Sequence, residues 1–237
     1  MNLQGHSCPT TTPSTVDHLP VGVGDNATIA GIEIRNSPGW GLVAFNISSG
    51  TYANGGLIYQ MVVHDNGMDA RRADNGTGIV ITGGSKNWCV VDSEVYNTFN
   101  GPTGPDASVT GNGGNSDGIA NNFGSSNNSF IAVRVHHTGD DGIDMWKGGQ
   151  SFWYFADVHD AGKVPQPLTG DGNGVKMGSP GDAVSHKFYK SSANNNKKGG
   201  WNLNGNSKQP TCFNGKEGCA ASGNPTGDYI NGMAVPK

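Results

Sequence analysis

Three short stretches of the chain decide its fold, and they read NSDGI at residues 115–119, GDDGID at 139–144 and DGNGVK at 171–176. Each stretch combines polar or acidic residues with a glycine and a β-branched residue, and mainly the polar positions change between copies. A phrase that recurs in this way is typical of a repeat protein, in which successive copies stack and bury a continuous core. We therefore expect the three stretches to lie in adjacent rungs of a sheet.

Aligning the copies on their β-branched residues brings the acidic positions together. Asp117 then lies beside Asp141, and Asp144 lies beside Lys176, in strands that are about 4.8 Å apart. Asp140 immediately precedes Asp141 and belongs to the same group. Four carboxylates and one amine are thus expected in a single patch on the outer wall of the repeat.

A second phrase, of the form hydrophobic-x-Val-x-polar, precedes each copy of the first. Its copies are IEIRN at 32–36, MVVHD at 61–65, SEVYN at 93–97, VRVHH at 133–137 and ADVHD at 156–160, with a weaker copy at 188–194. After each copy comes a glycine followed by an apolar residue, at Gly41, Gly78, Gly118, Gly142, Gly174 and Gly200. Successive glycines are 24 to 40 residues apart, so short strands of fixed pattern are joined by loops of variable length.

This organisation predicts an all-β protein, a right-handed parallel β-helix of about six coils. Alternation places Ile143 and Met145 inside the coil and Asp144 and Trp146 outside. An antiparallel sandwich would need hairpin turns of about two to five residues. A propeller would need a period of about 40–45 residues. Neither pattern fits the variable spacing.

The chain is expected to form a single β-helix domain. Residues 1–28 are predicted to be an N-terminal cap or partial coil, residues 29–206 the coils, and residues 207–237 an irregular tail. A ladder of polar turn residues is predicted at the end of the second phrase, at Asn36, Asp65, Asn97, His137, Asp160 and Asn194.

Composition argues against several functional classes. The 237 residues include 39 glycines and only 14% charged residues, as suits a β protein with many tight turns. The net charge of −4, without a basic stripe, argues against a nucleic-acid partner. No apolar run is long enough to cross a membrane. We expect a monomer.

A secreted protein is expected, although the sequence shows no signal peptide. Cys212 and Cys219 lie close together in a polar, glycine-rich region and are able to close a small loop. The sequence leaves open whether Cys8 and Cys89 are paired or free. Asn-x-Ser/Thr motifs compatible with secretion occur at Asn26, Asn46, Asn75 and Asn127.

The clustered carboxylates of Asp117, Asp140, Asp141 and Asp144 predict a metal site. Without a counter-ion their negative charges would repel one another. Oxygen ligands without cysteine or histidine favour a hard cation, and Ca²⁺ accepts an irregular set of about six to eight oxygens. A single aspartate before glycine is more often a turn residue, but four carboxylates on two adjacent rungs favour calcium.

Lys176 is expected in the same patch, facing outward and in register with Asp144. An exposed lysine is usually only a solvated charge, but a nearby cation would lower its pKa from about 10.4. A neutral amine beside a divalent cation is suited to remove a proton from carbon. The pattern therefore indicates a general base at Lys176.

The order of these motifs resembles that of polysaccharide lyase family 9, the β-helical pectate lyases. The motifs are NSDG at 115–118, DDGID at 140–144, GDGNGVK at 170–176 and KGGWNLNGN at 198–206, and the similarity runs over residues 31–206. Two departures are the isoleucines Ile119 and Ile143, where the family usually has an aromatic residue, and the smaller number of coils on the N-terminal side.

This resemblance implies a reaction and assigns roles to residues of the patch. The four aspartates would bind Ca²⁺, and Lys176 would be the catalytic base of a β-elimination on an acidic polysaccharide such as polygalacturonate. The cation would draw charge from the substrate carboxylate, which acidifies the C5 proton that is removed as the C4–O bond breaks. Substrate contacts are predicted at Trp146, Lys147, Asn173 and Asn202.

Two other functions remain open from the sequence. The pairs in NSD at 115–117 and at Asp140-Asp141 resemble motifs of polygalacturonase-type hydrolases, in which two carboxylates act as acid and base. The GHG and RIK phrases of those hydrolases are absent here. A non-catalytic carbohydrate-binding β-helix would account for the fold, but not for a lysine in register with four aspartates.

Overall fold

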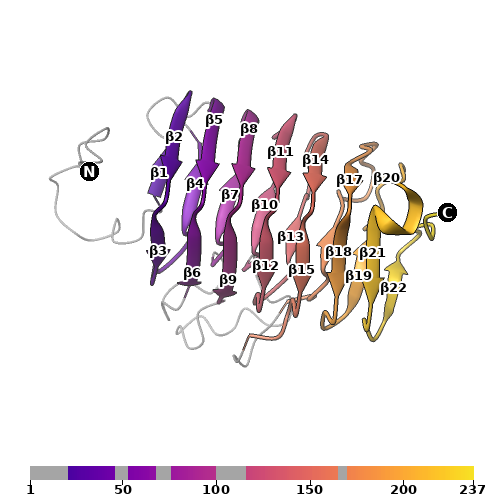
Figure 1. The fold of residues 1–237 in the computed structure, drawn as a ribbon. Helices are drawn as coiled ribbons and strands as arrows, with labels where there is room; N and C mark the ends of the chain where they lie inside the picture. Colours follow the sequence, from indigo (N-terminus) through magenta and orange to yellow (C-terminus); the bar gives the residue numbers. More distant parts are fainter. Residues whose placement is uncertain (1–20, 46–52, 68–75, 100–115, 165–169) are drawn as a thin grey trace, which may run out of the picture.

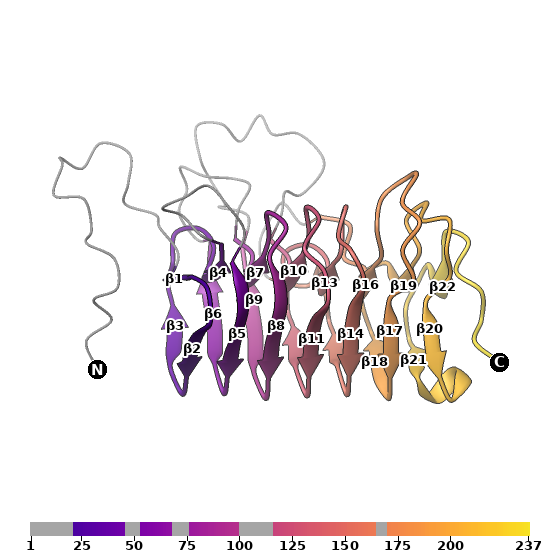
Figure 2. The same ribbon diagram turned by 90° about the horizontal axis from the view of Figure 1, so that it is seen from above.

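Each turn of the chain, called a coil here, contributes one short strand to each of three parallel sheets (Figure 1). The computed structural model describes residues 21–45, 53–67, 76–99, 116–164 and 170–237. Every third strand returns to the same sheet and pairs in parallel with the strand one coil earlier, so the sheets run along one long axis (Figure 2). The fold is a right-handed parallel β-helix, which confirms the predicted fold class.

The described strands fall into three sheets, named A, B and C here. Sheet A consists of β1 (Val21–Val23), β4 (Leu42–Ala44), β7 (Ile79–Ile81), β10 (Ile119–Asn121), β13 (Ile143–Asp144), β16 (Val175–Lys176), β19 (Gly199–Asn202) and β22 (Gly227–Ile230). Sheet B consists of β2 (Ala27–Ala30), β5 (Asn54–Tyr59), β8 (Lys86–Val91), β11 (Asn128–Ile131), β14 (Ser151–Tyr154), β17 (Lys187–Tyr189) and β20 (Thr211–Phe213). Sheet C consists of β3 (Glu33–Arg35), β6 (Val62–Asn66), β9 (Glu94–Thr98), β12 (Arg134–His136), β15 (Asp157–His159), β18 (Ser191–Asn194) and β21 (Cys219–Ser222). A 3₁₀ helix, η1 (Gly215–Glu217), joins β20 to β21. Across the described ranges, no helix is long and apolar enough to cross a membrane.

The described residues form seven coils and an eighth strand of sheet A, rather than about six coils. The coils already begin at β1, within the segment predicted to be a cap or partial coil. The prediction of an irregular tail at residues 207–237 was wrong, because this segment supplies β20, β21 and β22. A disulfide between Cys212 and Cys219 ties β20 to β21 and closes the small loop that the sequence allows.

The interior of the coils is filled by columns of apolar side chains that alternate with outward residues. On sheet B, the rings of Phe130 and Trp153 stack with their centroids 3.8 Å apart, and Phe188 occupies the same position one coil later. On the opposite side, Ile143 and Met145 are fully buried, as the alternation predicts.

A column of glycines at the entry to sheet A is required by close packing against sheet C. Its members are Gly41, Gly78, Gly118, Gly142, Gly174 and Gly200, each directly before a strand residue that is in ladder register with the next. A Cβ atom at Gly78 would lie 2.2 Å from Cγ1 of Val95 and 2.9 Å from a backbone oxygen of the next coil. A Cβ atom at Gly142 would likewise lie 2.2 Å from Cγ1 of Val158. The repeated glycine therefore has a direct steric cause.

A column of residues with positive φ lies at, or directly after, the C-terminal ends of the sheet C strands. It consists of Asn36 (φ 55°), Asp65 (φ 54°), Asn97 (φ 49°), His137 (φ 51°), Asp160 (φ 55°) and Asn195 (φ 54°). The first five agree with the predicted turn ladder, but its last member is Asn195 and not Asn194. Asn194 is still part of β18 and pairs with His159. Short polar side chains suit this position because they tolerate left-handed backbone best among non-glycine residues.

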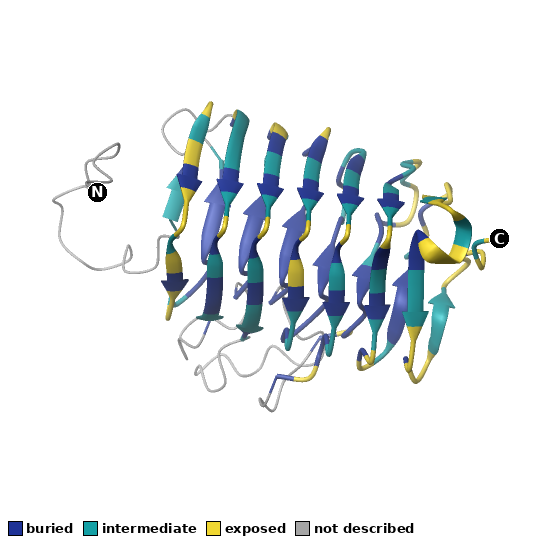
Figure 3. Cartoon of the chain, in the orientation of Figure 1, coloured by how far each residue is buried: buried dark blue, intermediate teal, exposed yellow. Residues whose placement is uncertain are grey.

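Sheet A differs from the other two sheets because most of its strands are buried on both faces (Figure 3). Every residue of β4, β7, β10 and β13 is buried, whereas β14 of sheet B alternates between buried and partly exposed positions. A strand that is buried on both faces has its outward side chains covered as well. Polar groups on the outer wall of sheet A therefore lie in a shielded environment.

We predict that Gly78→Ala lowers the free energy of unfolding by about 2 kcal/mol or more, because the new Cβ overlaps Val95 and overpacking of a core is costly. Gly24→Ala is the matched control, since a Cβ at Gly24 meets no atom within 4 Å. Urea unfolding followed by circular dichroism measures both. Equal stability of the two variants would contradict the steric role of the column.

Candidate functional site

The acidic residues predicted from the sequence lie together on the outer wall of sheet A. Asp117 precedes β10, Asp140 and Asp141 precede β13, and Asp144 pairs in register with Lys176 of β16. The four aspartates are 0–6% exposed, and Lys176 is partly exposed. The predicted patch is therefore present, on three successive coils.

Asp141 is the most completely bonded member of the patch. Its Oδ1 accepts hydrogen bonds from the backbone N–H and the side-chain Nδ2 of Asn173, each at 2.8 Å. Its Oδ2 accepts a hydrogen bond from Nζ of Lys176, also at 2.8 Å. Asp141 is thus held rigidly between the next coil's backbone and the lysine.

Among the described residues, Asp117 and Asp140 each accept hydrogen bonds through one oxygen. Oδ1 of Asp117 accepts a hydrogen bond from the backbone N–H of Asp141 at 3.2 Å, and Oδ1 of Asp140 accepts one from the N–H of Asp171 at 2.6 Å. Gly170 lets the chain approach closely, because a Cβ there would lie 2.0 Å from Oδ1 of Asp140. These contacts orient the two carboxylates and leave their second oxygens for another partner.

The arrangement fits a hard cation. One carboxylate oxygen from each of Asp117, Asp140 and Asp141 lies within 4.8 Å of the others. Two ligands of one Ca²⁺ ion, each about 2.3–2.6 Å from it, are separated by no more than about 5 Å. Asp144 stands beside this group, where its Oδ1 accepts a hydrogen bond from the backbone N–H of Trp146 at 3.1 Å.

The environment disfavours the ionised form of these carboxyls. Burial, together with the charges of Asp144, Asp140 and Asp141, raises the pKa of Asp117 well above its usual range. Burial and the neighbouring Asp141 raise the pKa of Asp140 to about 8, and burial raises the pKa of Asp144 to about 7. A cation bound among them would offset this penalty.

Lys176 is a counter-ion for the aspartates in this structure. Burial lowers the pKa of its amine, but the carboxylates of Asp141, Asp144, Asp117 and Asp140 raise it by more, and the net pKa is well above that of an ordinary lysine. The lowered pKa expected from the sequence therefore does not arise from the protein alone. It depends on a cation that compensates the carboxylates.

Two residues predicted to contact a substrate are instead buried supports. Asn173 is fully buried and its side chain holds Asp141. Asn202 is 1% exposed, and its Oδ1 accepts hydrogen bonds from the backbone of Asn204 and from Nδ2 of Asn231. Neither amide faces solvent, which corrects the prediction of direct substrate contact.

Trp146 and Lys147 lie at the edge of the patch, on the turn between β13 and β14. Nζ of Lys147 is 4.2 Å from the centroid of the Trp146 ring, and Phe123 of the preceding coil packs edge-on against the same ring. Phe123 is 52% exposed. It was not singled out from the sequence, although its place on the same turn one coil earlier would have indicated it.

The outer wall of sheet A is apolar on the N-terminal side of the patch. Val43, Val80 and Ala120 occupy the outward column that continues into Asp144 and Lys176, and Trp40 and Phe45 pack against them. This apolar stretch was also not identified from the sequence. The sequence feature that indicates it is an apolar residue two positions after the glycine, as in Gly41-Leu42-Val43 and Gly78-Ile79-Val80. The column thus passes from an apolar to a charged surface.

Comparison with known proteins supports the fold but gives no family. No protein-family model and no curated protein matches the chain. Among solved structures, the chain is similar to one described as "Crystal structure of pectate lyase Pel9A", with a TM-score of 0.62 at 18% sequence identity. The match covers 86% of this chain and 55% of that one, so the chain spans about half the length of that pectate lyase. At this identity, the likeness shows a shared β-helical fold.

We predict that Lys176→Met, measured in chelator, lowers the free energy of unfolding by about 3 kcal/mol, because it leaves the fully buried Asp141 without its charge partner. Lys198→Met is the matched control, since its ion pair with Asp171 is exposed and is worth less than about 1 kcal/mol. Chemical unfolding at neutral pH compares the two. A loss at Lys176 no larger than that at Lys198 would show that the amine is not the counter-ion of the patch.

Proposed function

We propose that the protein is a calcium-dependent polysaccharide lyase that cleaves a uronic-acid polymer, pectate above all, by β-elimination. The observation that carries this proposal is the single amine of Lys176, held in register beside four buried carboxylates on one wall of a β-helix. The β-helical likeness to a pectate lyase agrees with it. A lone buried carboxylate cluster would suggest only a metal site, whereas the amine adds a base.

The proposed roles follow from how each side chain is held. Asp117, Asp140, Asp141 and Asp144 would hold the cation, and Asn173 keeps Asp141 oriented for this task. When bound, Ca²⁺ would supply positive charge that polarises the substrate carboxylate and acidifies the adjacent C–H bond. Lys176 would accept the C5 proton while the C4–O bond breaks, so that the electron pair of the C5–H bond becomes the C4=C5 double bond. The leaving oxygen would take a proton from water and end as a free hydroxyl.

Lys176 must be neutral to act as this base. In the chain alone its amine donates to Asp141 and its pKa is raised by the carboxylates, so it holds its proton firmly. Compensating the carboxylate charge weakens this hold. The base and the metal ligands are therefore one electrostatic unit, and the proposal requires both.

Substrate would approach the patch at the border formed by Trp146 and Lys147, which are accessible to solvent. The apolar column of Val43, Val80 and Ala120 is only 1–2% exposed and offers the polymer no surface. An aromatic ring with an adjacent ammonium group is suited to a sugar that carries a carboxylate. We assign substrate binding to Trp146 and Lys147 and not to the buried amides.

The geometry is less favourable for the two rival functions. One carboxylate oxygen from each of Asp117, Asp140 and Asp141 lies within 4.8 Å of the others, which is closer than the roughly 6.5–9.5 Å separation of inverting glycosidases. Asp141, whose oxygens both accept hydrogen bonds, is poorly placed as a free acid or base. A purely carbohydrate-binding role would leave Lys176 with a structural role only, as the counter-ion of Asp141.

We also propose that the protein acts outside the cell. The disulfide between Cys212 and Cys219 suits an oxidising compartment. Cys89 forms no disulfide among the described residues, and Cys8 lies outside them. A polymeric acidic substrate also requires an enzyme that meets it outside the cell.

The lyase assignment predicts an ultraviolet-absorbing unsaturated product from polygalacturonate in the presence of calcium. Lys176→Ala, folded in calcium, is expected to reduce this rate about a thousandfold, the typical contribution of a general base. Absorbance of the product, read with calcium and with chelator, tests the reaction. Reducing ends released without absorbance would indicate a hydrolase. Activity retained in Lys176→Ala would exclude this lysine as the base.

Calcium binding predicts a separate, activity-independent readout. Calcium at about 100 times its Kd would stabilise the fold by about 2.7 kcal/mol, seen as a rise in Tm. Asp140→Asn is expected to lose most of this gain. Asp171→Asn is the matched control, because it also replaces an aspartate by asparagine but affects only an exposed ion pair with Lys198. This variant is expected to keep the calcium-dependent rise in Tm. Equal calcium responses of the two variants would argue against the proposed ligand set.

A further inference from the structure

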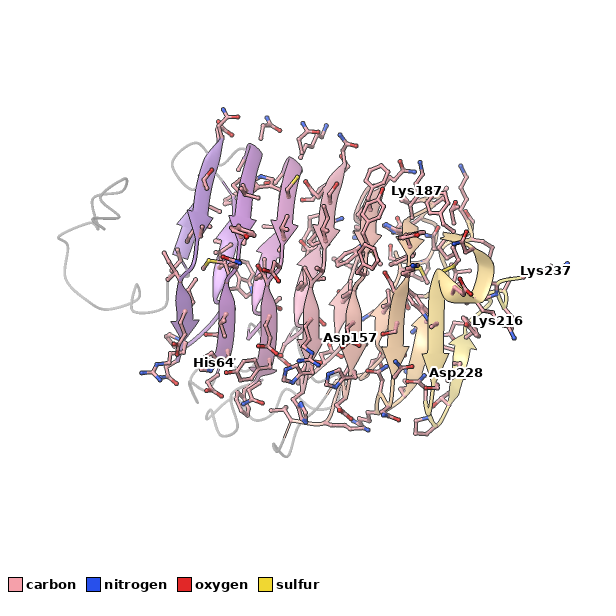
Figure 4. The ribbon with its side chains drawn as sticks, viewed as in Figure 1. His64, Asp157, Lys187, Lys216, Asp228 and Lys237 are labelled. Atoms are coloured by element: carbon pink, nitrogen blue, oxygen red, sulfur yellow. A yellow bond between two sulfur atoms is a disulfide. The ribbon has the colours of Figure 1, made fainter. Side chains whose placement is uncertain are left out.

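The outer face of sheet B changes character along the β-helix. One outward column, read from the N-terminal side, consists of Ala30, Tyr59, Val91, Ile131, Tyr154, Tyr189 and Phe213. The neighbouring outward column consists of Thr28, Leu57, Cys89, Ser129, Phe152, Lys187 and Thr211. Aromatic rings and lysines thus gather on β14 and β17, where Figure 4 marks Lys187. These two strands belong to the same coils as Asp144 and Lys176.

The rings form a partly exposed platform rather than a packed core. The centroids of Tyr154 and Tyr189 are 6.4 Å apart, and Phe155 packs edge-on against Tyr189 at 5.5 Å. Phe155 is 49% exposed, and Phe213 at the next coil is 41% exposed. Phe152, Tyr154 and Tyr189 are partly exposed, so these rings also offer accessible apolar area.

Two lysines of this platform are held over aromatic rings instead of beside carboxylates. Nζ of Lys187 lies 5.1 Å from the centroid of Phe152, and Nζ of Lys190 lies 5.6 Å from that of Tyr189. No described carboxylate forms an ion pair with either amine, whereas Lys163 and Lys198 each pair with an aspartate. Their positive charge is therefore uncompensated in a protein of net charge −4.

The same pairing of lysine and ring occurs at the edge of the acidic patch. Among the described residues, the cation–π pairs are Lys147 with Trp146, Lys187 with Phe152 and Lys190 with Tyr189. The pair of Lys147 and Trp146 lies on the turn from sheet A to sheet B. The pair of Lys187 and Phe152 lies on β17 and β14 of sheet B, and Lys190 directly follows β17. The pairs thus follow a path from the acidic patch around the corner of the β-helix.

We propose that the lysine–aromatic face, defined by Phe152, Tyr154, Phe155, Lys187, Tyr189 and Lys190, is a second, non-catalytic binding surface for an acidic polysaccharide. The aromatic rings offer flat apolar area to the C–H faces of sugar rings, and the ammonium groups pair with carboxylates along the polymer. The two ammonium groups of this face favour a negatively charged polysaccharide over a neutral one. The inference rests on the substrate class proposed above, but on different residues and a different sheet.

Binding to polygalacturonate in chelator tests the proposal, because the acidic patch then lacks its cation and the polymer is not consumed. The double variant Lys187→Ala/Lys190→Ala and the single variant Tyr189→Ala are each expected to raise the Kd about tenfold, which corresponds to about 1.4 kcal/mol. Lys86→Ala/Lys237→Ala is the charge-matched control, since both lysines are exposed and lie outside the face. Tyr59→Ala is the matched control for the ring, because Tyr59 lies in the same outward column on β5.

The outcomes separate this proposal from the proposed reaction. Weaker binding by the face variants alone, together with weak binding of the fully methyl-esterified polymer to the unmodified protein, supports the surface. Unchanged binding by both face variants, or equal binding of the esterified polymer, overturns it. Cleavage of a short uronate oligomer is measured separately with calcium. A failure there concerns the acidic patch and leaves the result for this face intact.

Discussion

The close approach of sheet C to the start of each sheet A strand is the constraint on which the rest of the structure depends. At Gly142 a side chain would overlap Cγ1 of Val158 at 2.2 Å and a backbone oxygen of the next coil at 2.7 Å. Only glycine lets the chain approach the neighbouring coil this closely. Because the coils from β4 to β19 meet the same restriction at the same point, their sheet A strands start in step. That common start aligns Asp144 with Lys176.

The negative charge of the aligned patch is only partly compensated by the protein itself. Its carboxyls are buried because sheet A is covered on both faces, and burial raises the pKa of Asp117, Asp140 and Asp144. Lys176 offsets one charge through Asp141. The carboxylates raise the pKa of Lys176 and keep its amine protonated. The groups that would bind a cation therefore also prevent Lys176 from acting as a base unless a cation compensates their charge. This coupling is the physical basis of the proposal that a cation and Lys176 act together.

Much of this arrangement was predictable because local pattern and packing agree. The glycine and the β-branched residue of each phrase fix the register, and the register brings Asp117, Asp141 and Lys176 together. The C-terminal coil was missed because its strand β22 departs from the phrase. Asp228 occupies the place that corresponds to Gly200, so no glycine marks the turn. The burial of Asn173 and Asn202 was not predictable, because an asparagine in a glycine-rich stretch is typical of an exposed turn. Only the packing of the neighbouring coils shows that these two side chains are covered.

The turn that leads from sheet C into sheet A also explains why the acidic residues are placed so firmly in the middle coils. Near the C-terminus this turn holds buried asparagines, and the side chain of Asn196 bonds to Asn224 of the next coil. In the coils that carry the patch, threonines stand at the corresponding place. Thr98 donates to the backbone oxygen of Ser116, beside Asp117, and Thr138 donates to that of Asp140. The hydroxyl of Thr98 also accepts a hydrogen bond from the backbone N–H of Gly139 in the next coil. The carboxylates of Asp117, Asp140 and Asp141 likewise accept backbone N–H groups of the coil that follows each of them. The acidic segments are thus fixed both within their own coil and by the next one.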